Sequence, residues 1–580
     1  MKPTTRPFAL KVAAALGAAL VLAGCSTDPS SSQGRDSDSS ASGQAQLIDA
    51  PGPDDVRQWL AYDRQADFDA VKTAVRVPTR DGTDLACNLF RPGHDGKASD
   101  GRYPSVVLNF TPYALDASDN QSEYLAERGY NVAVCNVRGS GESGGEFPSW
   151  FQPVEPLDNY DLIEWLAAQP YSTGDVGQVG GSYGSITAYR VAALNPPHLR
   201  TIVPVVSPTN IYAEWVYPGG VPTTDGTWWA TEAPIISPQA HADTLRSFQN
   251  HPTYDKYWKQ VATTNKLASA NVPVLYVGGY FDIFKAGGFD AFRQKPEQTW
   301  LLYGPWDHAG GFSVPGKNRG PNDPDPAVAI SYATVLQWFD HWVSKRDGAD
   351  LPADRVTSFE STSEHGGGRW TKHAQWPAPT VENQRLYPAP GGQLADQPSA
   401  PGQTTYSANP YDGPSVGQTG NVPTEPTVDQ AESEVSSTNS KGRDNSDRTT
   451  FTLPAYEEDT VVAGPVTLHL NASITAADTY FISKLEAVTT DGRVLPIETG
   501  NLRAQLRTSL EKVEPVPANA PVQYTIDLGH THWRFKTGEK LRVTLSSGDF
   551  PRVQPTAPAG LVTINHGPQT YLEVPVLPNQ

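Results

Sequence analysis

A serine between glycines is the residue in this chain whose setting most clearly suggests chemistry. Residues 180–184 read Gly-Gly-Ser-Tyr-Gly, the pattern G-x-S-x-G, with Ser182 at its centre. In this pattern the serine occupies a sharp turn between a strand and a helix. The strand-like run 176–179 precedes the motif, and the helical pattern 186–194 follows it and ends before two prolines. The spacing therefore predicts that Ser182 is a nucleophile.

A serine nucleophile needs a base, and the base needs an acid that orients it. After a G-x-S-x-G turn, the acid comes first along the chain and the histidine second. Asp282 and His308 follow Ser182 in that order, each just past a strand-like run, where catalytic groups gather. Asp307 is the rival acid, but it adjoins the histidine, and neighbouring side chains diverge. His341 falls in a helical pattern and is predicted to be structural.

The segments around these residues alternate between strand-like and helical patterns, such as the helical run 161–168. Such alternation predicts a largely parallel α/β sheet. We expect its strands at 85–90, 105–110, 131–137, 201–206, 272–277 and 300–303, the last of these ending the sheet.

Two regions depart from this alternation. The segment between residues 206 and 271 interrupts it and is rich in Trp and Tyr. From about residue 351, apolar and polar residues alternate with the period of a half-buried strand, as at 466–475 and 541–546. The second pattern predicts an all-β sandwich.

Further motifs run in the order found in one family, the Xaa-Pro dipeptidyl-peptidase and cocaine-esterase-like serine hydrolases. Over roughly residues 70–575 the chain resembles this family. The matching segments are Asn-Phe-Thr-Pro-Tyr (109–113), Asn-Val-Arg-Gly-Ser-Gly (136–141), Gly-Ser-Tyr-Gly (181–184), Gly-Tyr-Phe-Asp (279–282), Gly-Pro-Trp-Asp-His (304–308), Trp-Phe-Asp-His-Trp (338–342), Leu-Arg-Ala (502–504) and Ser-Ser-Gly-Asp-Phe-Pro-Arg (546–552).

The resemblance implies an α/β-hydrolase fold, with a mixed, mostly parallel sheet, a helical cap insertion and a C-terminal jelly roll. It also implies a triad of Ser182, Asp282 and His308. In this family the oxyanion is held by the backbone N–H after the nucleophile, here Tyr183, and by a Tyr hydroxyl, here Tyr113. A lipase-like His-Gly-Gly-Gly at 365–368 lies far beyond the histidine and is discounted.

Aromatic residues of the cap suit an apolar acyl or aromatic group, although some of them form the core of the cap. Peptidases of this family bind a free amine with carboxylates, and related amino-acid ester hydrolases carry acids soon after the catalytic Asp. Here Ile283, Phe284 and Lys285 occupy those places. The candidate pocket residues are Trp215, Tyr217, Trp228, Trp229 and Phe281.

The prediction is a serine hydrolase of a small-molecule ester or short peptide, acting as a cocaine-esterase-like acyl esterase without metal or cofactor. Xaa-Pro dipeptidyl-peptidase activity is the first alternative, and a catalytically silent carbohydrate-binding surface lipoprotein is the second. The resemblance also places the strands of Cys87 and Cys135 side by side and antiparallel. A disulfide and two buried free thiols both remain open for this pair.

The N-terminal residues predict export. A basic start precedes the apolar run 12–22, which is too short for a bilayer span and typical of a signal peptide. The run ends Leu-Ala-Gly-Cys, which resembles a bacterial lipoprotein signal with Cys25 as the lipidated residue. We therefore expect the protein on the outer face of the bacterial membrane.

Composition excludes other classes. A net charge of −19 disfavours a nucleic-acid partner, and three Cys leave no zinc-type cluster. No oligomeric state follows from the sequence. The predicted organisation is a signal peptide (1–24), a disordered tether (25–50), a first α/β part (51–208), the cap insertion (209–268), a second α/β part (269–350) and the β-sandwich (351–580).

Overall fold

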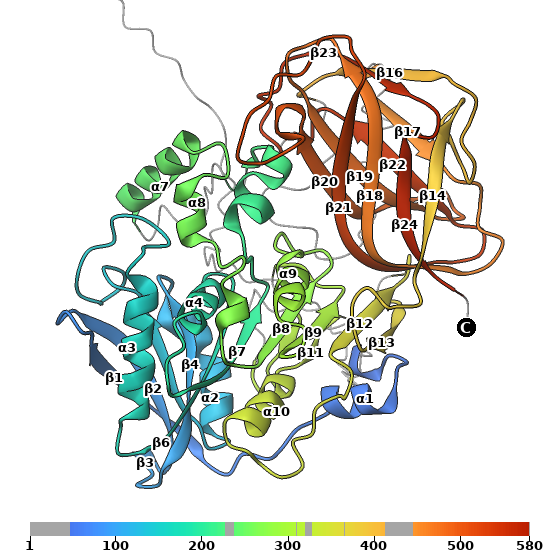
Figure 1. The fold of residues 1–580 in the computed structure, drawn as a ribbon. Helices are drawn as coiled ribbons and strands as arrows, with labels where there is room; N and C mark the ends of the chain where they lie inside the picture. The colour runs from blue at the N-terminus through green and yellow to red at the C-terminus, as the bar shows by residue number, and fades with distance from the viewer. Residues whose placement is uncertain are drawn as a thin grey trace, which may run out of the picture. The chain divides into compact units, whose positions relative to one another are not determined.

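The structure is a computed structural model of the whole chain (Figure 1). It describes residues 47–224, 226, 237–308, 310–318, 328–364, 366–411, 445–550 and 552–578. The predictions for the signal peptide, Cys25, Trp228, Trp229 and His365 lie outside these ranges. The chain divides into two units, 1–43 and 44–580, and the description below concerns the second. Among the described residues, no helix combines the length and apolar character needed to cross a bilayer.

A mixed, mostly parallel sheet forms the N-terminal half. Its strands run in the order β1–β2–β5–β4–β6–β7–β8–β9–β12–β13, and the pairs from β5 to β12 are parallel. Their bounds are β1 (Asp69–Pro78), β2 (Asp84–His94), β4 (Tyr103–Thr111), β5 (Asn131–Asn136), β6 (Ser172–Gly181), β7 (Leu199–Val205), β8 (Val274–Gly279), β9 (Thr299–Gly304), β12 (Val356–Ser361) and β13 (Gly368–His373), with β3 (Lys97–Ala98) against β2.

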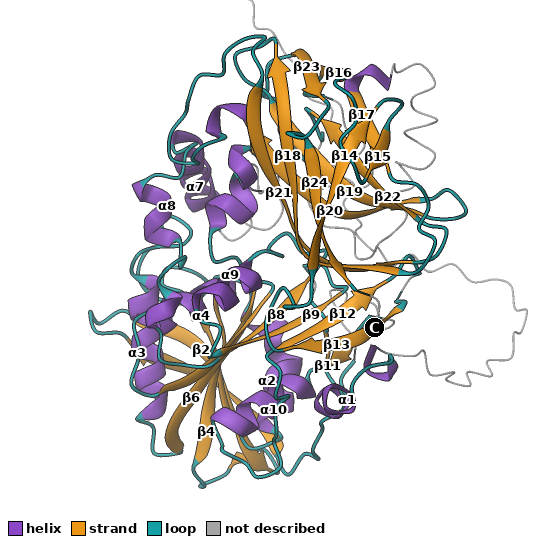
Figure 2. Cartoon of the chain, turned by 45° about the vertical axis from the view of Figure 1, so that its right-hand side comes forward, coloured by secondary structure: helices purple, strands orange, loops and turns teal. Residues whose placement is uncertain are grey.

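Helices cover both faces of this sheet (Figure 2). On one face lie α1 (Asp54–Leu60), α2 (Asp119–Ala126) and α10 (Ala333–Trp342), and on the other lie α3 (Glu155–Ala167), α4 (Tyr183–Ala192) and α9 (Gly287–Gln294). Successive strand residues enter opposite cores: Val106 belongs to one and Val107 to the other. Strands buried on both faces explain why the sequence shows continuous apolar runs here.

The end of this sheet differs from the prediction. We expected the run 300–303 to be the last strand and residues from 351 to belong to the sandwich. Instead β12 pairs in parallel with β9, with Val356 opposite Leu301, and β13 follows it antiparallel. Its sequence, Val-Thr-Ser-Phe-Glu-Ser, is mostly polar, yet every residue of β12 is buried. By pairing, β12 covers what would otherwise be an exposed strand edge.

The segment between β7 and β8 is helical where the structure describes it. Its elements are η3 (Tyr212–Val216), η4 (Pro218–Gly220), α7 (Pro238–Asn250), α8 (Lys256–Val261) and η5 (Leu267–Ser269). Rings of Tyr212, Tyr217, Phe248 and Trp258 pack against one another in its core.

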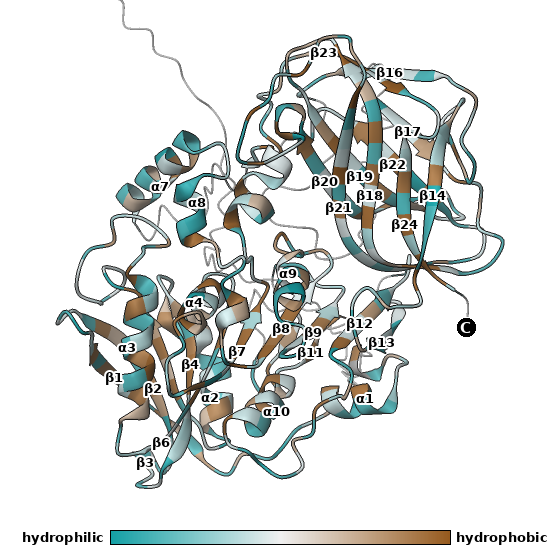
Figure 3. Cartoon of the chain, viewed as in Figure 1, coloured by the Kyte–Doolittle hydropathy of each residue, from teal (hydrophilic) through white to brown (hydrophobic). Residues whose placement is uncertain are grey.

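Two mostly antiparallel sheets form the C-terminal half around a separate core. Over residues 465–474 of β18, buried residues alternate with partly exposed ones as predicted, and Figure 3 shows hydrophobic and hydrophilic residues along the strand. One sheet holds β14 (Glu382–Ala389), β16 (Gln403–Ala408), β18 (Thr460–Ile474), β21 (Val522–Phe535), β23 (Gly560–Asn565) and β24 (Tyr571–Leu577). The other holds β15 (Gln393–Ala395), β17 (Arg448–Thr452), β19 (Tyr480–Val488), β20 (Val494–Arg503) and β22 (Lys540–Ser546).

The remaining described elements are short. They are η1 (Leu47–Asp49), η2 (Leu115–Ser118), η7 (Asn445–Asp447), η8 (Ala504–Leu506) and the parallel pair β10 (Phe312–Ser313) and β11 (Ile330–Ser331).

The two cysteines of the sheet lie directly opposite each other. Cys87 on β2 and Cys135 on β5 face one another across an antiparallel pair, and the structure joins them by a disulfide bond. Of the two alternatives left open by the sequence, the structure therefore has the disulfide.

Candidate active site

Ser182 lies at the turn that the sequence predicts. Strand β6 ends at Gly181 and helix α4 begins at Tyr183. Ser182 itself has φ +51° and ψ −113°, a region that residues with a side chain rarely occupy. Such a conformation costs roughly 1–3 kcal/mol and persists where the surroundings impose it. Here the Ser182 N–H donates to the Val205 carbonyl (3.1 Å), which holds the turn against β7.

The spacing of the motif has a steric origin. A Cβ atom added at Gly184 would lie 2.3 Å from Asn109 Oδ1, and one at Gly180 would lie 2.5 Å from the Gly184 carbonyl carbon. A Cβ at Gly181 would meet nothing within 4 Å. The two outer glycines of G-x-S-x-G are therefore required by close packing of β6, α4 and Asn109, and the inner one is not.

Asn109 supports the turn from the neighbouring strand. It lies at a bulge of β4 with φ +60°. Its Oδ1 accepts the Gly181 N–H (3.1 Å), and its Nδ2 donates to Ser118 Oγ (2.9 Å). Sequence reasoning used Asn109 only as a family marker. Its position as the first residue of the Asn-Phe-Thr-Pro-Tyr motif was the available signal for this role.

The three predicted triad side chains come together. His308 Nε2 lies 2.9 Å from Ser182 Oγ. On the other side of the ring, His308 Nδ1 lies 3.2 and 3.3 Å from the two carboxylate oxygens of Asp282, which is 3% exposed. The carboxylate at His308 Nδ1 is therefore that of Asp282, the residue predicted in preference to Asp307.

Two adjoining loops carry the acid and the base. Asp282 follows β8 and His308 follows β9. The loops are bonded to each other, because the Phe281 N–H donates to the Trp306 carbonyl (3.1 Å). A Cβ at Gly279 would lie 1.9 Å from the Trp306 oxygen, so the close approach needs glycine there.

The two predicted oxyanion donors border the turn. Tyr183 is the first residue of α4, and an N–H in that position has no acceptor within its helix. Its phenol is engaged elsewhere: the hydroxyl donates to Glu155 Oε1 (2.6 Å), and burial raises the pKa of Tyr183 well above its usual value. The Tyr113 ring lies edge-on to the Tyr183 ring, with 6.2 Å between centroids. This contact brings the Tyr113 side chain to the start of α4.

The predicted pocket residues separate into three groups. Trp215 packs edge-on against Phe284, whose ring in turn packs edge-on against His308 (centroids 5.1 Å apart). Tyr217 and Phe281 make their described contacts elsewhere. The Tyr217 hydroxyl donates to the Phe248 carbonyl (3.1 Å) inside the insertion, and Phe281 packs against the C-terminal core. Trp228 and Trp229 lie outside the described residues.

Phe284 was missed as a pocket residue, although it stands two positions after Asp282. The aromatic count of the insertion drew the prediction there, whereas ring orientation depends on the tertiary packing.

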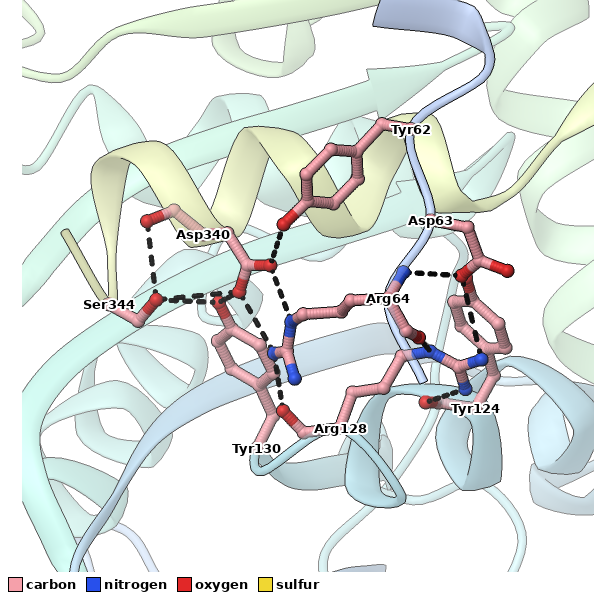
Figure 4. Close-up of polar contacts among 8 residues, drawn as sticks. All are labelled: Tyr62, Asp63, Arg64, Tyr124, Arg128, Tyr130, Asp340 and Ser344. Carbon is pink, nitrogen blue, oxygen red and sulfur yellow. Dashed lines mark hydrogen bonds and ion pairs between the residues drawn. The ribbon is translucent and has the colours of Figure 1, made fainter. Parts of the chain in front are cut away.

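A second aspartate motif lies away from Ser182. Asp340 on α10 is 0% exposed and accepts from the Tyr62 hydroxyl (2.7 Å), Arg64 Nε (2.7 Å) and the Tyr130 hydroxyl (2.7 Å), as Figure 4 shows. His341 donates through Nδ1 to the Ala349 carbonyl (2.8 Å), in keeping with the structural role predicted for it. These contacts tie residues 62–64 to the central sheet's helices.

Within the described ranges, His, Cys, Asp and Glu side chains form no group placed to hold a metal ion.

Two family models match parts of this chain. Residues 81–310 match the model of X-Pro dipeptidyl-peptidase (S15 family), and residues 352–573 match that of the X-Pro dipeptidyl-peptidase C-terminal non-catalytic domain.

Relatives span nearly the whole chain. A cocaine esterase from Rhodococcus sp. (strain MB1 Bresler) is 25% identical, covering 83% of this chain and 92% of its own. A putative Xaa-Pro dipeptidyl-peptidase from Bacillus anthracis is 21% identical over 76% of this chain and 72% of its own. The structure of an aminopeptidase from a marine sediment archaeon, Thaumarchaeota archaeon, superposes with a TM-score of 0.71 at 20% identity, covering 89% of this chain and 98% of that one.

Together with the cocaine esterase relative, these two matches support one conclusion: the chain is a serine hydrolase.

Proposed function

We propose that the chain hydrolyses carboxylic esters through an acyl-enzyme on Ser182. In the first half, Ser182 Oγ attacks the ester carbonyl while His308 Nε2 takes its proton and then gives it to the leaving alcohol. In the second half, water attacks the acyl-enzyme and the same nitrogen relays its proton back to Ser182. Asp282 orients the imidazole, and the Tyr183 N–H and the Tyr113 O–H donate to the developing oxyanion.

The ester assignment rests on the identity and contacts of the three residues after Asp282. Recognition of a substrate ammonium needs a carboxylate beside the acyl site. Here Ile283 packs into the core, Phe284 lies against His308, and the Lys285 ammonium pairs with the buried carboxylate of Glu498. This segment supports a neutral, apolar acyl group next to the scissile bond.

Xaa-Pro dipeptidyl-peptidase activity is the second candidate. The Bacillus anthracis relative carries that description, and a buried carboxyl group, Glu214, stands next to Trp215 in the insertion. Burial raises the pKa of Glu214 to about 8. A carboxyl group that is neutral at pH 7 is a weak partner for an ammonium, which favours the ester reading.

A matched pair of substrates separates the two candidates. The p-nitrophenyl esters of phenylalanine and of 3-phenylpropionate differ by the α-amine and share leaving group and size. We expect kcat/KM for the amine-free ester to equal or exceed that for the amino ester. A preference for the amino ester of roughly 100-fold, together with turnover of Ala-Pro anilide, would instead establish the peptidase. A catalytically silent carbohydrate-binding protein would hydrolyse neither ester and take up no fluorophosphonate label at Ser182.

Export and anchoring complete the proposal. The chain is carried to the outer face of the bacterial membrane and held there by a lipid on Cys25. The predicted tether 25–50 is wrong at its end, because Leu47 is buried in η1 and its carbonyl accepts from Trp370 Nε1 (2.8 Å), so the proposed tether ends at residue 46. The C-terminal sandwich is a jelly roll. Neither nucleic acid nor a cofactor takes part. Metabolic palmitate labelling of the wild type and of Cys25→Ser tests the anchor, and an unlabelled wild type contradicts it.

A further inference from the structure

The loop that carries Asp282 is held at both of its ends. It leaves β8 at Tyr280 and reaches Lys285 before α9 begins. Each of these end residues makes a polar contact with a side chain of the region 352–573, the part of the chain that matches a C-terminal domain described as non-catalytic. The contacts lie on opposite sides of the triad acid in the chain.

The first contact is a buried chain of hydrogen bonds. The Tyr280 hydroxyl lies 2.7 Å from Ser358 Oγ on β12, and Ser358 Oγ lies 2.7 Å from His532 Nδ1 on β21. All three side chains are buried. Burial, followed by neighbouring positive groups, lowers the pKa of His532 well below its usual value. Both contacts join groups that can donate and accept, so the three side chains form one continuous chain of hydrogen bonds in either direction.

The second contact is an ion pair. Lys285 Nζ bonds Glu498 Oε2, and the Glu498 side chain on β20 has no exposure to solvent. The Lys285 carbonyl also accepts from the Tyr303 hydroxyl (2.9 Å), so the main chain is held at the same residue. Removing one member of such a pair would leave a buried charge without its partner.

The loop between these ends is short and internally bonded. The Asp282 N–H donates to the Gly279 carbonyl (3.2 Å), and the Lys285 N–H donates to the Asp282 carbonyl (3.3 Å). The Phe284 N–H donates to Asp282 Oδ1 (2.6 Å). A displacement of either end therefore moves the Asp282 carboxylate relative to His308.

We propose that these two contacts position the catalytic acid, so that the C-terminal domain takes part in catalysis by placing Asp282. Tyr280, Ser358 and His532 act at the first end of the loop, and Lys285 with Glu498 acts at the second. The proposal rests on the role of Asp282 proposed above. None of these residues needs to touch the substrate, and all are positioning residues.

Placement matters here because the bonds between Asp282 and His308 are already long. Charge-assisted N–H···O bonds in proteins are usually about 2.7–2.9 Å, whereas the two distances here are 3.2 and 3.3 Å. A further shift takes the carboxylate beyond useful reach of Nδ1. Misplacement of a catalytic group by about 1 Å can cost roughly 100-fold in rate.

A matched control exists elsewhere in the same sheet. Tyr130 also donates a 2.7 Å hydrogen bond from a buried hydroxyl, in its case to Asp340 (Figure 4). Its bond partner lies on α10, outside the loop 280–285. Tyr280→Phe and Tyr130→Phe therefore each remove one buried tyrosine hydroxyl, and the bond that Tyr130 loses, to a carboxylate, is the stronger of the two.

The first experiment compares kcat, KM and Tm of these two variants with p-nitrophenyl butyrate. We expect Tyr280→Phe to lower kcat roughly 10-fold with KM within about 2-fold, the signature of a lost transition-state interaction. Tyr130→Phe should lower Tm at least as much as Tyr280→Phe and leave kcat at the wild-type value. Equal kcat in both variants overturns the proposal for the first contact.

Substitutions of His532, the last residue of the first contact, test the same hydrogen-bond chain from its other end. Asn at position 532 can present a polar atom near the place of Nδ1, whereas Leu cannot. His532→Leu should lower kcat as Tyr280→Phe does, and His532→Asn should recover most of it at equal Tm. A kcat that follows Tm across both His532 variants, whatever the side chain, shows a purely structural role.

The second contact needs a paired substitution, because a lone charge would unfold the region. Lys285→Met with Glu498→Gln removes both charges and keeps the shape. We expect a folded protein whose kcat is lowered several-fold. Wild-type kcat in this double variant limits the positioning role to the first contact and overturns the two-ended form of the proposal.

Asp282→Asn separates failure of this proposal from failure of the proposed function. If Asp282→Asn loses activity while Tyr280→Phe and the double variant keep theirs, the positioning proposal alone is wrong. If Asp282→Asn is as active as the wild type, the assignment of the acid is wrong and the positioning proposal falls with it.

Discussion

Two buried aspartates show how this chain uses similar groups for different ends. Asp340 is surrounded by donors from distant segments: the hydroxyls of Tyr62 and Tyr130 and the guanidinium of Arg64. Asp282 lies equally deep, but its oxygens meet a backbone N–H and the ring of His308. The Asp340 carboxylate only accepts hydrogen bonds from its neighbours. The Asp282 carboxylate instead contacts the imidazole of His308, which in turn contacts the Ser182 hydroxyl.

The two hydrogen-bond networks differ in whether they lead to a group that can react. The contacts of Asp340 described above link distant segments of the chain to one another and lead to no reactive atom. We therefore interpret this cluster as structural: it holds residues 62–64, α2 and α10 together (Figure 4). The triad instead ends at Ser182, which is held in a backbone conformation that side-chain residues rarely adopt. Strain of this kind gathers at functional sites. Burial of a carboxylate alone therefore does not identify a catalytic group. A chain of contacts from the carboxylate to a reactive atom does.

The largest expected effect comes from removing that reactive atom. Ser182→Ala should lower kcat for p-nitrophenyl butyrate by roughly 10⁶-fold, because no acyl-enzyme can form. Tm should stay at the wild-type value, since the hydroxyl is bonded to His308 rather than to the core. Steady-state kinetics and thermal unfolding on the same preparation check both parts. Appreciable turnover by a folded Ser182→Ala protein would show that another nucleophile acts.

Asp282→Asn tests the first side of the comparison. An amide in place of the carboxylate disfavours the correct imidazole tautomer and the developing imidazolium, so kcat should fall about 10⁴-fold. The Phe284 N–H can still donate to the remaining amide oxygen, so Tm should change little. The measurement is kcat beside the unfolding midpoint. A large loss of stability with modest loss of rate would place Asp282 with Asp340 as a structural group.

Asp340→Asn tests the other side. The amide cannot serve the guanidinium of Arg64 and both tyrosine hydroxyls, so buried donors lose their acceptor. Breaking a buried charge network of this kind costs about 3–5 kcal/mol. Urea unfolding should show that loss, while kcat per folded molecule stays at the wild-type value. If kcat fell with stability unchanged, the separation between the two aspartates would be lost.

The two regions also differ in how far the sequence reveals them. Ser182, Asp282 and His308 could be predicted because a local motif and a chain order mark them. The Asp340 network could not, since Tyr62 and Tyr130 lie 278 and 210 positions away in the chain.

Tertiary context also explains what the sequence did not show. Aromatic composition does not reveal which way a ring points, so it could not separate Trp215, whose ring packs against Phe284, from Tyr217, which bonds within the insertion. The mostly polar sequence of β12 hid a fully buried strand that completes the central sheet. The sequence did predict the mixed sheet, the helical insertion and the C-terminal sandwich, because each of them is marked by a pattern that extends over many residues.

Tyr113→Phe sharpens the comparison at the oxyanion. A hydroxyl that donates mainly in the transition state should lower kcat roughly 10²–10³-fold when removed, with KM nearly unchanged. The ring contact with Tyr183 survives in Phe, so the turn should keep its geometry. Kinetics over a range of ester concentrations separate kcat from KM. A change confined to KM would mean that Tyr113 binds substrate and does not hold the oxyanion.

Another carboxyl group, that of Glu214, differs from Asp340 in having no cation beside it among its described contacts. It therefore tests whether a buried carboxyl group needs a neighbouring cation to stay ionised. Its Oε1 accepts the N–H groups of Thr209 (2.9 Å) and Asn210 (2.8 Å), whereas Asp340 faces the guanidinium of Arg64. Burial raises the pKa of Glu214 from 4.5 to about 8. Between those values the folded state keeps a proton that the unfolded state has lost, so this group's contribution to stability declines as pH rises from 4.5 through 8.

Glu214→Gln should remove that decline, because Gln does not titrate and its oxygen can still accept from both N–H groups. The wild type and the variant should have similar urea midpoints at pH 5, and the variant should become progressively more stable than the wild type at pH 7 and pH 9. Unfolding curves at the three pH values measure the difference directly. Parallel profiles would mean that Glu214 is already ionised when folded, and that two backbone N–H groups with the Thr209 hydroxyl can hold a buried carboxylate without a cation.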